Sequence, residues 1–446
     1  MLLTVQVLVY QYLTMCLLMY LVVHHGVQAL GGESSLEDVT KHLIQLRMST
    51  LDAAAKEEEY EIILPSSSPK LPPRPTVKRG PPVSLEEWAK HFDDDGRMIN
   101  IKELKEKIFR GGISPILRYD AWKFLLDYMP STATREEWQE IRKRKVEEYI
   151  QMKHQWKSMT EDQESRFSYF RERKNLIEKD VNRTDRTIPY FEGNDNPNVQ
   201  LLYDILMTYV MYNFDLGYVQ GMSDLLSPIL YLMENEVDAF WCFVGFMNKM
   251  SKNFEMDQAG IKQQLKNLNI LIRFTDRELG NYLESNESDN LFFCFRWLLI
   301  LFKREFSYQD IMVLWEVLWS DLPGPNFHLF ICLAILDTER DVLIGNEYGF
   351  TEILKHINDL SLHINLQDIL IKAEAIYLQL LAAEELPDSV KVILNLPVSE
   401  RRIDSESTEE LVIPPTSDHI SNGEPSQSES MESTEQMYEQ ALSLYL

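Results

Sequence analysis

The amino-acid sequence predicts an all-helical protein. Between residues 83 and 396, apolar side chains recur every three or four positions, which is the spacing of one face of a helix. Two Ser/Thr-x-x-Glu motifs, beginning at Ser84 and Thr134, are typical of the capping boxes that start helices. No run of residues alternates between apolar and polar side chains for long enough to indicate a strand. We therefore expect helices throughout this region and no sheet.

Composition and charge narrow the classes of function. The chain has 446 residues, of which 45% are hydrophobic and 11% aromatic, so it can bury a sizeable core. Its 70 acidic and 44 basic residues give a formal net charge of −26, which repels phosphate backbones and argues against a nucleic-acid partner. The four cysteines share no zinc-like or redox spacing, and we expect buried thiols in a reducing compartment.

The first 32 residues form an apolar segment whose role stays open. Residues 2–30 contain no Lys, Arg, Asp or Glu, but their densest apolar part, residues 13–23, is about half of the roughly 20 residues that a membrane span needs. The absence of a basic start argues against a signal peptide. A membrane anchor, an element that docks on the domain, and an atypical N-terminal exon are the three interpretations.

A linker and a tail flank the helical region. Residues 33–82 are interpreted as a linker, with a short helix around residues 36–51 and a proline-rich, extended and flexible end. Within it, Pro72–Pro75 matches a motif that SH3 domains bind, although such stretches more often only space domains apart. Residues 397–446 are rich in Ser and Glu and poor in large apolar side chains, so we expect a disordered acidic tail.

Within residues 83–396 the apolar stripes predict core helices. The motif at Thr134 opens a long helical pattern that includes Tyr149, Ile150 and Trp156. A second stripe begins at Val237. The run Leu291–Phe302 is apolar nearly all round, and we expect it to form one central core helix that is too short to span a membrane.

The familiar catalytic motifs are missing from the sequence. It contains no GxxxxGK[ST] loop, no GxGxxG, no HExxH and no GxSxG. We therefore expect no self-contained active site, no cofactor and no metal site of its own. A helical protein without such chemistry is expected to act on another protein.

Two loops differ from the core pattern. The stretch Ile177–Arg183 reads IxxDxxR directly after a helical pattern. In the second loop, Gly217 and Gly221 bracket the sequence Tyr-Val-Gln and leave Gln220 on a tight connection, because glycine lets the backbone turn sharply. Ser223 and Asp224 are then expected to cap the following helix. Chemistry alone does not decide their role, since an Arg near an Asp is usually a surface ion pair.

The motifs together resemble the TBC domain, the Rab GTPase-activating protein family. IxxDxxR is followed by YxQ, and an RxxxW element lies upstream, in the order that the family has. The resemblance covers residues 83–396, with a core motif region of about 111–322, and is close enough to indicate a subgroup. That subgroup carries a long extra region before its TBC domain. Its absence here implies an isoform, a partial gene model or a divergent relative.

The resemblance implies a V-shaped multi-helix domain that binds a GTP-loaded Rab and supplies two catalytic side chains in trans. GTP and Mg²⁺ then belong to the Rab. Arg186 lies outside the IxxDxxR register and is expected at the surface or behind the site. The matched positions are the catalytic Arg183 and Gln220, the loop residues Asp180, Tyr218 and Asp224, and the mainly structural Arg118 and Trp122.

The resemblance also implies a cytoplasmic protein that regulates vesicle and endosomal trafficking. It would be recruited to endomembranes mainly through its Rab, which the subgroup suggests is late endocytic. Two alternatives remain open: a catalytically silent Rab-binding scaffold, and an adaptor anchored in the membrane by residues 2–30. A silent relative is expected to have lost one or both of the catalytic side chains, and both are present here.

Overall fold

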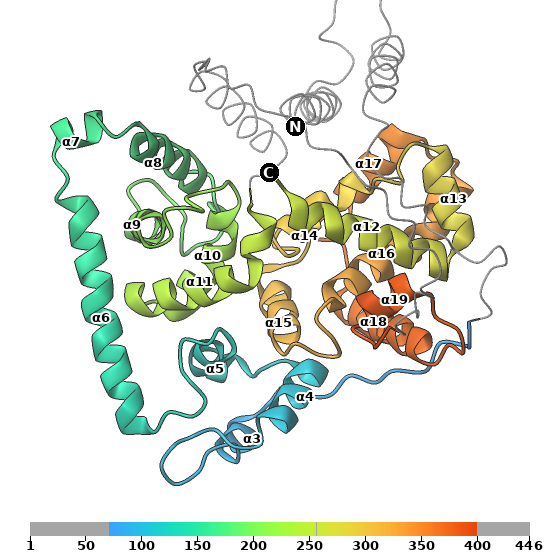
Figure 1. Ribbon diagram of the computed structural model, residues 1–446, viewed down its shortest axis with the longest axis horizontal. Coiled ribbons are helices and arrows are strands. Elements are labelled where there is room, and N and C mark those ends of the chain that lie inside the picture. The colour runs from blue at the N-terminus through green and yellow to red at the C-terminus, as the bar shows by residue number, and fades with distance from the viewer. Residues whose placement is uncertain (1–70, 256, 399–446) are drawn as a thin grey trace, which may run out of the picture. The chain divides into compact units, whose positions relative to one another are not determined.

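The computed structural model describes residues 71–255 and 257–398. All regular elements in these two ranges are α-helices or short 3₁₀ turns, and the only β pairings there are two isolated bridges. Figure 1 shows this helical arrangement. The all-helical prediction is therefore confirmed for the part of the chain that the structure describes.

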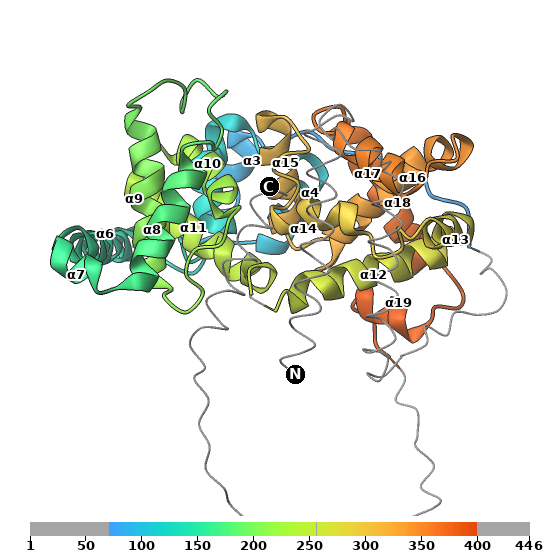
Figure 2. The ribbon, with the colours of Figure 1, turned by 90° about the horizontal axis from the view of Figure 1, so that it is seen from above.

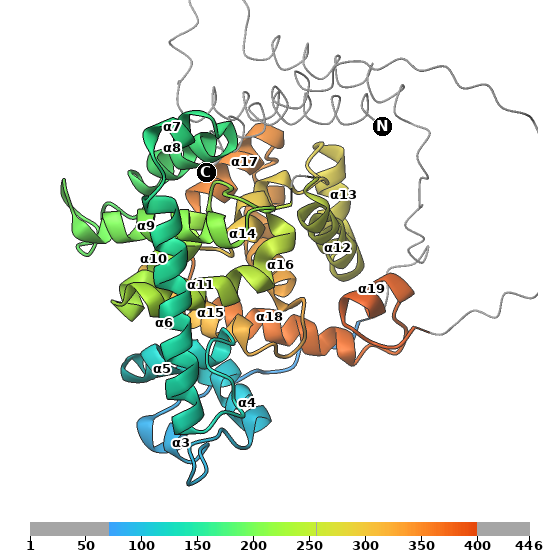
Figure 3. The same cartoon turned by 60° about the vertical axis from the view of Figure 1, so that its left-hand side comes forward.

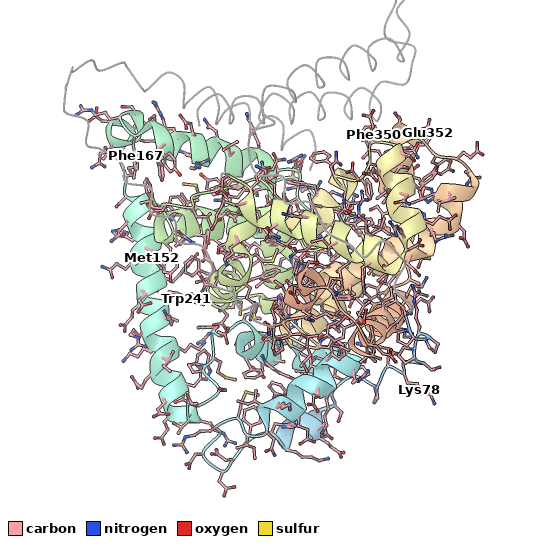
Figure 4. The ribbon with its side chains drawn as sticks, turned by 45° about the vertical axis from the view of Figure 1, so that its right-hand side comes forward. Lys78, Met152, Phe167, Trp241, Phe350 and Glu352 are labelled. Carbon is pink, nitrogen blue, oxygen red and sulfur yellow. The ribbon has the colours of Figure 1, made fainter. Side chains whose placement is uncertain are left out.

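Residues 71–82, the last part of the predicted linker, lie against the helical domain. Arg74 donates to Asp337 of α16 (Phe327–Gly345) with an N–O distance of 2.9 Å, and Gln379 Nε2 of α18 (Leu366–Leu381) donates to the Pro72 carbonyl at 2.7 Å. Lys78, labelled in Figure 4, belongs to the same segment. This end of the linker is therefore attached to the domain, and the arginine of the SH3-type motif is already paired.

The first helices begin at the predicted capping motifs. At Thr134 both hydrogen bonds of the capping box are present. At Ser84 the side chain accepts from Glu87 N, but the Glu87 carboxylate binds Lys107 and Lys90 instead of the cap backbone, so that box is only half formed. The elements are α3 (Leu85–Ala89), α4 (Ile101–Gly111), η1 (Pro115–Leu117), α5 (Arg118–Leu125) and α6 (Arg135–Lys157).

The long helix α6 contacts α9 (Pro197–Tyr212) and α11 (Glu236–Met250), and Figure 3 shows it crossing in front of them. Trp241 fixes α11 to it, since its Nε1 donates to the Lys145 carbonyl at 3.0 Å; Figure 4 labels Trp241 and, on α6, Met152. Tyr149 and Trp156 are buried as predicted, whereas Ile150 is 57% exposed. The apolar stripe on α6 is thus narrower than the sequence suggested.

The central helices carry both candidate loops. α10 is the most buried of them and packs against α8, α9 and α11. Nearly all of the stripe that begins at Val237 is buried on α11. The elements are α7 (Glu161–Ser165), α8 (Ser168–Val181), α9 (Pro197–Tyr212), α10 (Met222–Met233), α11 (Glu236–Met250) and η2 (Ser251–Asn253).

The C-terminal helices pack around α16. This helix contacts α12, α13 and α18, and Figure 2 shows α16 and α18 side by side. The elements are α12 (Ala259–Thr275), α13 (Arg277–Ser285), η3 (Phe292–Cys294), α14 (Phe295–Leu299), α15 (Tyr308–Trp319), α16, α17 (Phe350–Asp359), α18 and α19 (Asp388–Ile393).

The prediction of one core helix over Leu291–Phe302 is wrong in its extent. The segment forms the 3₁₀ turn η3 and the short helix α14, and Leu301 and Phe302 have positive φ values of 46° and 61° that end the helix. The turn leaves the Leu301 carbonyl free to accept from Trp315 Nε1 at 2.9 Å. The predicted burial is confirmed, because nearly every apolar side chain of the segment is buried.

The predictions for residues 1–70 and 399–446 lie outside the described residues. These include the anchor at residues 2–30, the helix at residues 36–51 and the acidic tail. Among the described residues, no helix combines the length and the apolar character needed to cross a membrane. The three cysteines in the described ranges are free and buried, as expected.

Candidate functional site

The arginine loop begins where α8 ends. Ile177 and Asp180 are buried on the last turns of the helix, and the Asp180 carbonyl accepts from Arg183 N at 3.1 Å. The same carbonyl accepts from the Thr184 hydroxyl at 2.8 Å. These bonds close a turn directly after the helix, and the turn carries the Arg183 side chain out of the core.

The glutamine loop depends on its two glycines. Gly217 and Gly221 have φ values of +64° and +100°, a backbone conformation that other residues rarely adopt. A Cβ atom at Gly217 would lie 2.7 Å from the Tyr169 hydroxyl. Arg173 supports the same loop from α8, because its NH1 donates to the Tyr218 carbonyl at 3.2 Å. The predicted need for glycine on both sides of the glutamine is confirmed.

The Asp180 carboxylate connects the two loops. Its Oδ1 accepts from Arg183 Nε at 3.0 Å and lies 2.9 Å from Arg183 NH2. Its Oδ2 accepts from three groups of the glutamine loop and α10: the Tyr218 hydroxyl, Gly221 N at 3.2 Å and Ser223 Oγ at 2.9 Å. One buried carboxylate therefore fixes both loops, with one oxygen for each.

The hydrogen bond from Tyr218 to Asp180 requires a protonated phenol. Burial, followed by the negative charge of Asp180, raises the pKa of Tyr218 well above its ordinary value. The hydroxyl consequently stays a donor at any physiological pH. The carboxylate that receives it is only 3% exposed, and its several donors take the place of the water that burial removes.

The two candidate catalytic side chains differ in exposure. The Arg183 side chain is 42% exposed, although it is paired with Asp180. Gln220 is only 5% exposed, and its buried Nε2 has no hydrogen-bond partner among the residues that the structure describes. A buried amide donor without a partner is costly and rare. The Gln220 amide therefore keeps donor capacity that the described part of the chain leaves unused.

The expected helix cap at Ser223 and Asp224 is wrong. Gly221 is the N-cap residue of α10, and Ser223 and Asp224 lie inside the first turn of the helix. Their side chains point to other partners: Ser223 donates to Asp180, and Asp224 receives Arg304 in a bidentate pair at 3.2 and 3.0 Å. Burial opposes ionisation of Asp224, but Arg304 and Lys303 outweigh it and lower the pKa of Asp224.

Two further residues of the arginine loop, Asp185 and Arg186, have partners other than Asp180. Asp185, which has a left-handed φ of 47°, pairs with Lys303 at 2.9 Å and accepts from the Ser227 hydroxyl. Arg186 donates to the Gly193 carbonyl within its own loop. Asp185 thus ties the loop to the core, and Arg186 ties the loop to itself.

Arg118 and Trp122 do not join this group. Both are buried against Glu316 of α15, whose Oε1 accepts from Arg118 Nε at 2.5 Å and from Trp122 Nε1 at 3.1 Å. Burial raises the pKa of Glu316, although Arg118 and Trp122 oppose that shift. These contacts give both residues a place in the core that links α5 to α15.

Sequence reasoning missed several supporting residues. Arg173 and Lys303 contact the loops and Arg304 contacts Asp224 at the start of α10, yet none of the three lies in the sequence motifs. The adjacent Lys303 and Arg304 directly follow the buried apolar run. Two cations at the end of a core segment need buried acidic partners, and that signal could have indicated them.

Comparison with known proteins agrees with the fold. The sequence model of the Rab-GTPase-TBC domain matches residues 115–344. TBC1 domain family member 17 of Homo sapiens is 53% identical over 361 residues, which cover 81% of this chain and 55% of that protein. GTPase-activating protein GYP7 of Yarrowia lipolytica is 40% identical, with coverage of 74% and 47%. The chain spans about half the length of these curated relatives.

A solved structure shows the fold independently. The Ypt/Rab-GAP domain of Gyp1p superimposes with a TM-score of 0.58 at 24% sequence identity, over 67% of this chain and 98% of that domain. The motifs had indicated the subgroup of members 15 and 17, and the similarity to member 17 agrees with that prediction.

Proposed function

This chain belongs to the Rab-GTPase-TBC domain family, and from that membership we propose that it accelerates GTP hydrolysis by a Rab-type small GTPase. The observation that carries the proposal is the position of Asp180, whose two carboxylate oxygens hold the loops of Arg183 and Gln220 together. In this proposal the chain is not an enzyme with its own active site. It supplies two side chains to the nucleotide site of its partner.

The proposed task of Arg183 is to meet negative charge in the transition state of phosphoryl transfer. A guanidinium stays ionised and donates several hydrogen bonds from a planar group, which suits phosphate oxygens. An arginine supplied in trans is worth roughly 10³–10⁵ in rate in small GTPases. Arg183 is exposed enough to leave Asp180 when a phosphate is offered, and Asp180 keeps three other donors on Oδ2 after it leaves.

The proposed task of Gln220 is to position the attacking water. A carboxamide can donate to that water through its nitrogen and accept from it through its oxygen. The Nε2 atom of Gln220 has an unused donor that such a contact would satisfy. Because Gln220 is only 5% exposed in the free chain, docking of the GTPase must turn the side chain outward.

The finer assignments rest on the subgroup resemblance alone. They are a late endocytic Rab as substrate, a role in vesicle and endosomal trafficking, and a cytoplasmic protein recruited to endomembranes by its Rab. They stay predictions, and a panel of purified Rabs in a GTP hydrolysis assay addresses the first of them directly.

The test of the arginine is the variant Arg183→Ala in a single-turnover phosphate-release assay with that panel. We expect stimulation of GTP hydrolysis to fall by roughly 10³-fold, while circular dichroism stays unchanged because the side chain is partly exposed and lies outside the core. Arg186→Ala is the matched control, since it removes a neighbouring arginine of the same loop, and it should keep nearly full activity. Equal stimulation by wild type and Arg183→Ala would refute the assignment and favour a silent binding scaffold.

The glutamine is tested separately by Gln220→Ala. We expect the maximal rate of hydrolysis to fall, with a smaller change in the affinity for the GTPase, because water positioning acts on the chemical step. Affinity is measured on the GTPase loaded with a non-hydrolysable nucleotide. A variant that binds much more weakly but hydrolyses at the wild-type maximal rate would contradict this role.

A further inference from the structure

A second cluster of polar side chains joins α3 to α4. Glu87 lies on α3, His91 lies in the turn that follows, and Glu103 lies on α4. Each offers one ligand atom, and the three atoms lie within 4.8 Å of one another. Glu87 and His91 are separated by four positions, so a single turn of chain brings them to the same side. The cluster is unrelated to the loops of Arg183 and Gln220.

The His91 ring is held in one orientation and one tautomer. It is only 2% exposed, and its Nδ1 lies 3.2 Å from the Ile99 carbonyl oxygen. A carbonyl only accepts, so Nδ1 carries a proton, and in the neutral ring Nε2 is then the nitrogen with the free lone pair. Nε2 is buried and has no hydrogen-bond partner within the described ranges. Histidines that bind metals are held in this way, with the other ring nitrogen bonded to a carbonyl or carboxylate.

The two carboxylates already attract a cation. Lys107 Nζ donates to Glu87 Oε1 and, at 2.7 Å, to Glu103 Oε1. The ammonium leaves His91 Nε2 unsatisfied. Because the Lys107 side chain is 36% exposed, it can turn outward into water when a stronger cation arrives.

We propose that Glu87, His91 and Glu103 form a binding site for a zinc-type divalent cation that displaces the Lys107 ammonium. One imidazole nitrogen with two carboxylate oxygens is a ligand set that zinc accepts, with water in the fourth position. Calcium and magnesium prefer oxygen ligands alone. The ligand atoms must approach to roughly 3.3 Å from one another for tetrahedral zinc. The bound ion would clip α3 to α4, a role that does not depend on the proposed GTPase-activating function.

The experiment is calorimetric titration of the full chain, dialysed against a chelator, with ZnCl₂, MgCl₂ or CaCl₂. We expect one equivalent of zinc to bind at this site and neither magnesium nor calcium to compete. Glu103→Gln should weaken this zinc binding at least tenfold, since even outer-shell partners of a metal contribute about 10–100-fold. Lys107→Met should strengthen it, because the competing ammonium is removed.

Two controls separate zinc binding at this cluster from zinc binding elsewhere on the chain. The adjacent His24 and His25 lie outside the described residues and can bind zinc by themselves, so the double variant His24→Gln/His25→Gln should retain the binding assigned to the cluster. Glu103 is exposed on α4, so its substitution leaves folding intact, whereas His91→Gln changes a buried side chain and is secondary. The proposal is overturned if the wild type binds no zinc, whatever Lys107→Met does, or if Glu103→Gln binds zinc as tightly as the wild type.

Discussion

At Tyr218 a single hydroxyl determines how firmly the glutamine loop is held. It donates to Asp180 Oδ2 from a fully buried position. Tyr218→Phe removes this bond, while Gly221 N and Ser223 Oγ remain on the same oxygen. We expect the free energy of unfolding to fall by about 1.5–3 kcal/mol, the usual range for a hydrogen bond to a charged group. Urea unfolding measures that change.

The same variant should also slow the proposed reaction by roughly tenfold or more, because loose placement of Gln220 loses the gain from proximity. Tyr209→Phe is the matched control: Tyr209 is equally buried, but its hydroxyl accepts from Asn213 at 3.3 Å, outside the two loops. It should leave the rate of stimulated hydrolysis unchanged. If both variants slow hydrolysis alike, the hydroxyl of Tyr218 has no special role.

At the level of elements, the glutamine loop is limited by the space beside Gly217. An added Cβ would lie 2.7 Å from Tyr169 Oη and 3.0 Å from Arg173 Nε, in a backbone conformation with φ of +64°. Gly217→Ala should therefore lower the free energy of unfolding by roughly 1–2 kcal/mol, the cost of a left-handed conformation for a residue with a Cβ. The close contact with Tyr169 and Arg173 should lower it further. It should also displace the loop and lower GTPase stimulation.

The control for this prediction is Gly193→Ala. Gly193 also has a positive φ, of +88°, but no atom lies within 4 Å of the position of its Cβ. The variant should show the backbone cost alone and keep its activity. Thermal or urea unfolding of both variants measures the difference, and an equal loss of stability in the two would show that the contact with Tyr169 is harmless.

The sequence predicted the elements better than their ends. The helical spacing and the capping box at Thr134 were sufficient because both depend on neighbours within a few residues. The Glu87 carboxylate does not complete the capping box at Ser84, because it pairs instead with Lys107 of α4. The run Leu291–Phe302 does not form one helix, because Leu301 and Phe302 adopt positive φ values that local helix propensity does not predict.

In the candidate site, too, the sequence predicted the local features but not the contacts between residues far apart in the chain. The motifs identify Arg183 and Gln220, and glycine spacing predicts the tight loop around the glutamine. They could not predict that Asp180 accepts hydrogen bonds from both loops, because that contact joins residues far apart in the chain. The predicted helix cap at Ser223 and Asp224 was wrong for the same reason, since Ser223 bonds Asp180 and Asp224 pairs with Arg304, both far away in the chain.

At the scale of the whole domain, buried carboxylates hold the helices to one another. Asp238 of α11 accepts from Tyr119 on α5, from Tyr128 and from Arg142 on α6, at 2.8, 3.0 and 3.2 Å. Three more aspartates make similar inter-element pairs. For all four, burial opposes ionisation, but the hydrogen-bonded and charged partners prevail and lower the pKa. They are Asp204, Asp224, Asp238 and Asp337.

These lowered pKa values predict how the domain responds to acid. A carboxyl whose pKa is lower in the folded than in the unfolded chain stabilises the fold above the unfolded value, which is 3.8 for aspartate. That contribution is lost as the pH falls through the folded value. Burial raises the pKa of Glu316, so Glu316 acts in the opposite direction. With four buried aspartates against one buried glutamate, we expect the free energy of unfolding to fall steeply below about pH 4.

Asp238→Asn tests one of these four aspartates separately. At pH 7 the substitution should lower the free energy of unfolding by about 3–5 kcal/mol, because it leaves Arg142 and Lys123 without their buried carboxylate. Since acid removes the stabilisation that an aspartate with a lowered pKa contributes, the difference between wild type and variant should shrink as the pH falls below about 3.8, the unfolded value. Asp215→Asn, at an exposed position, should show a small difference that does not change with pH. Urea unfolding at four pH values tests this, and a difference for Asp238→Asn that stays constant would mean that its charge does not hold α5, α6 and α11 together.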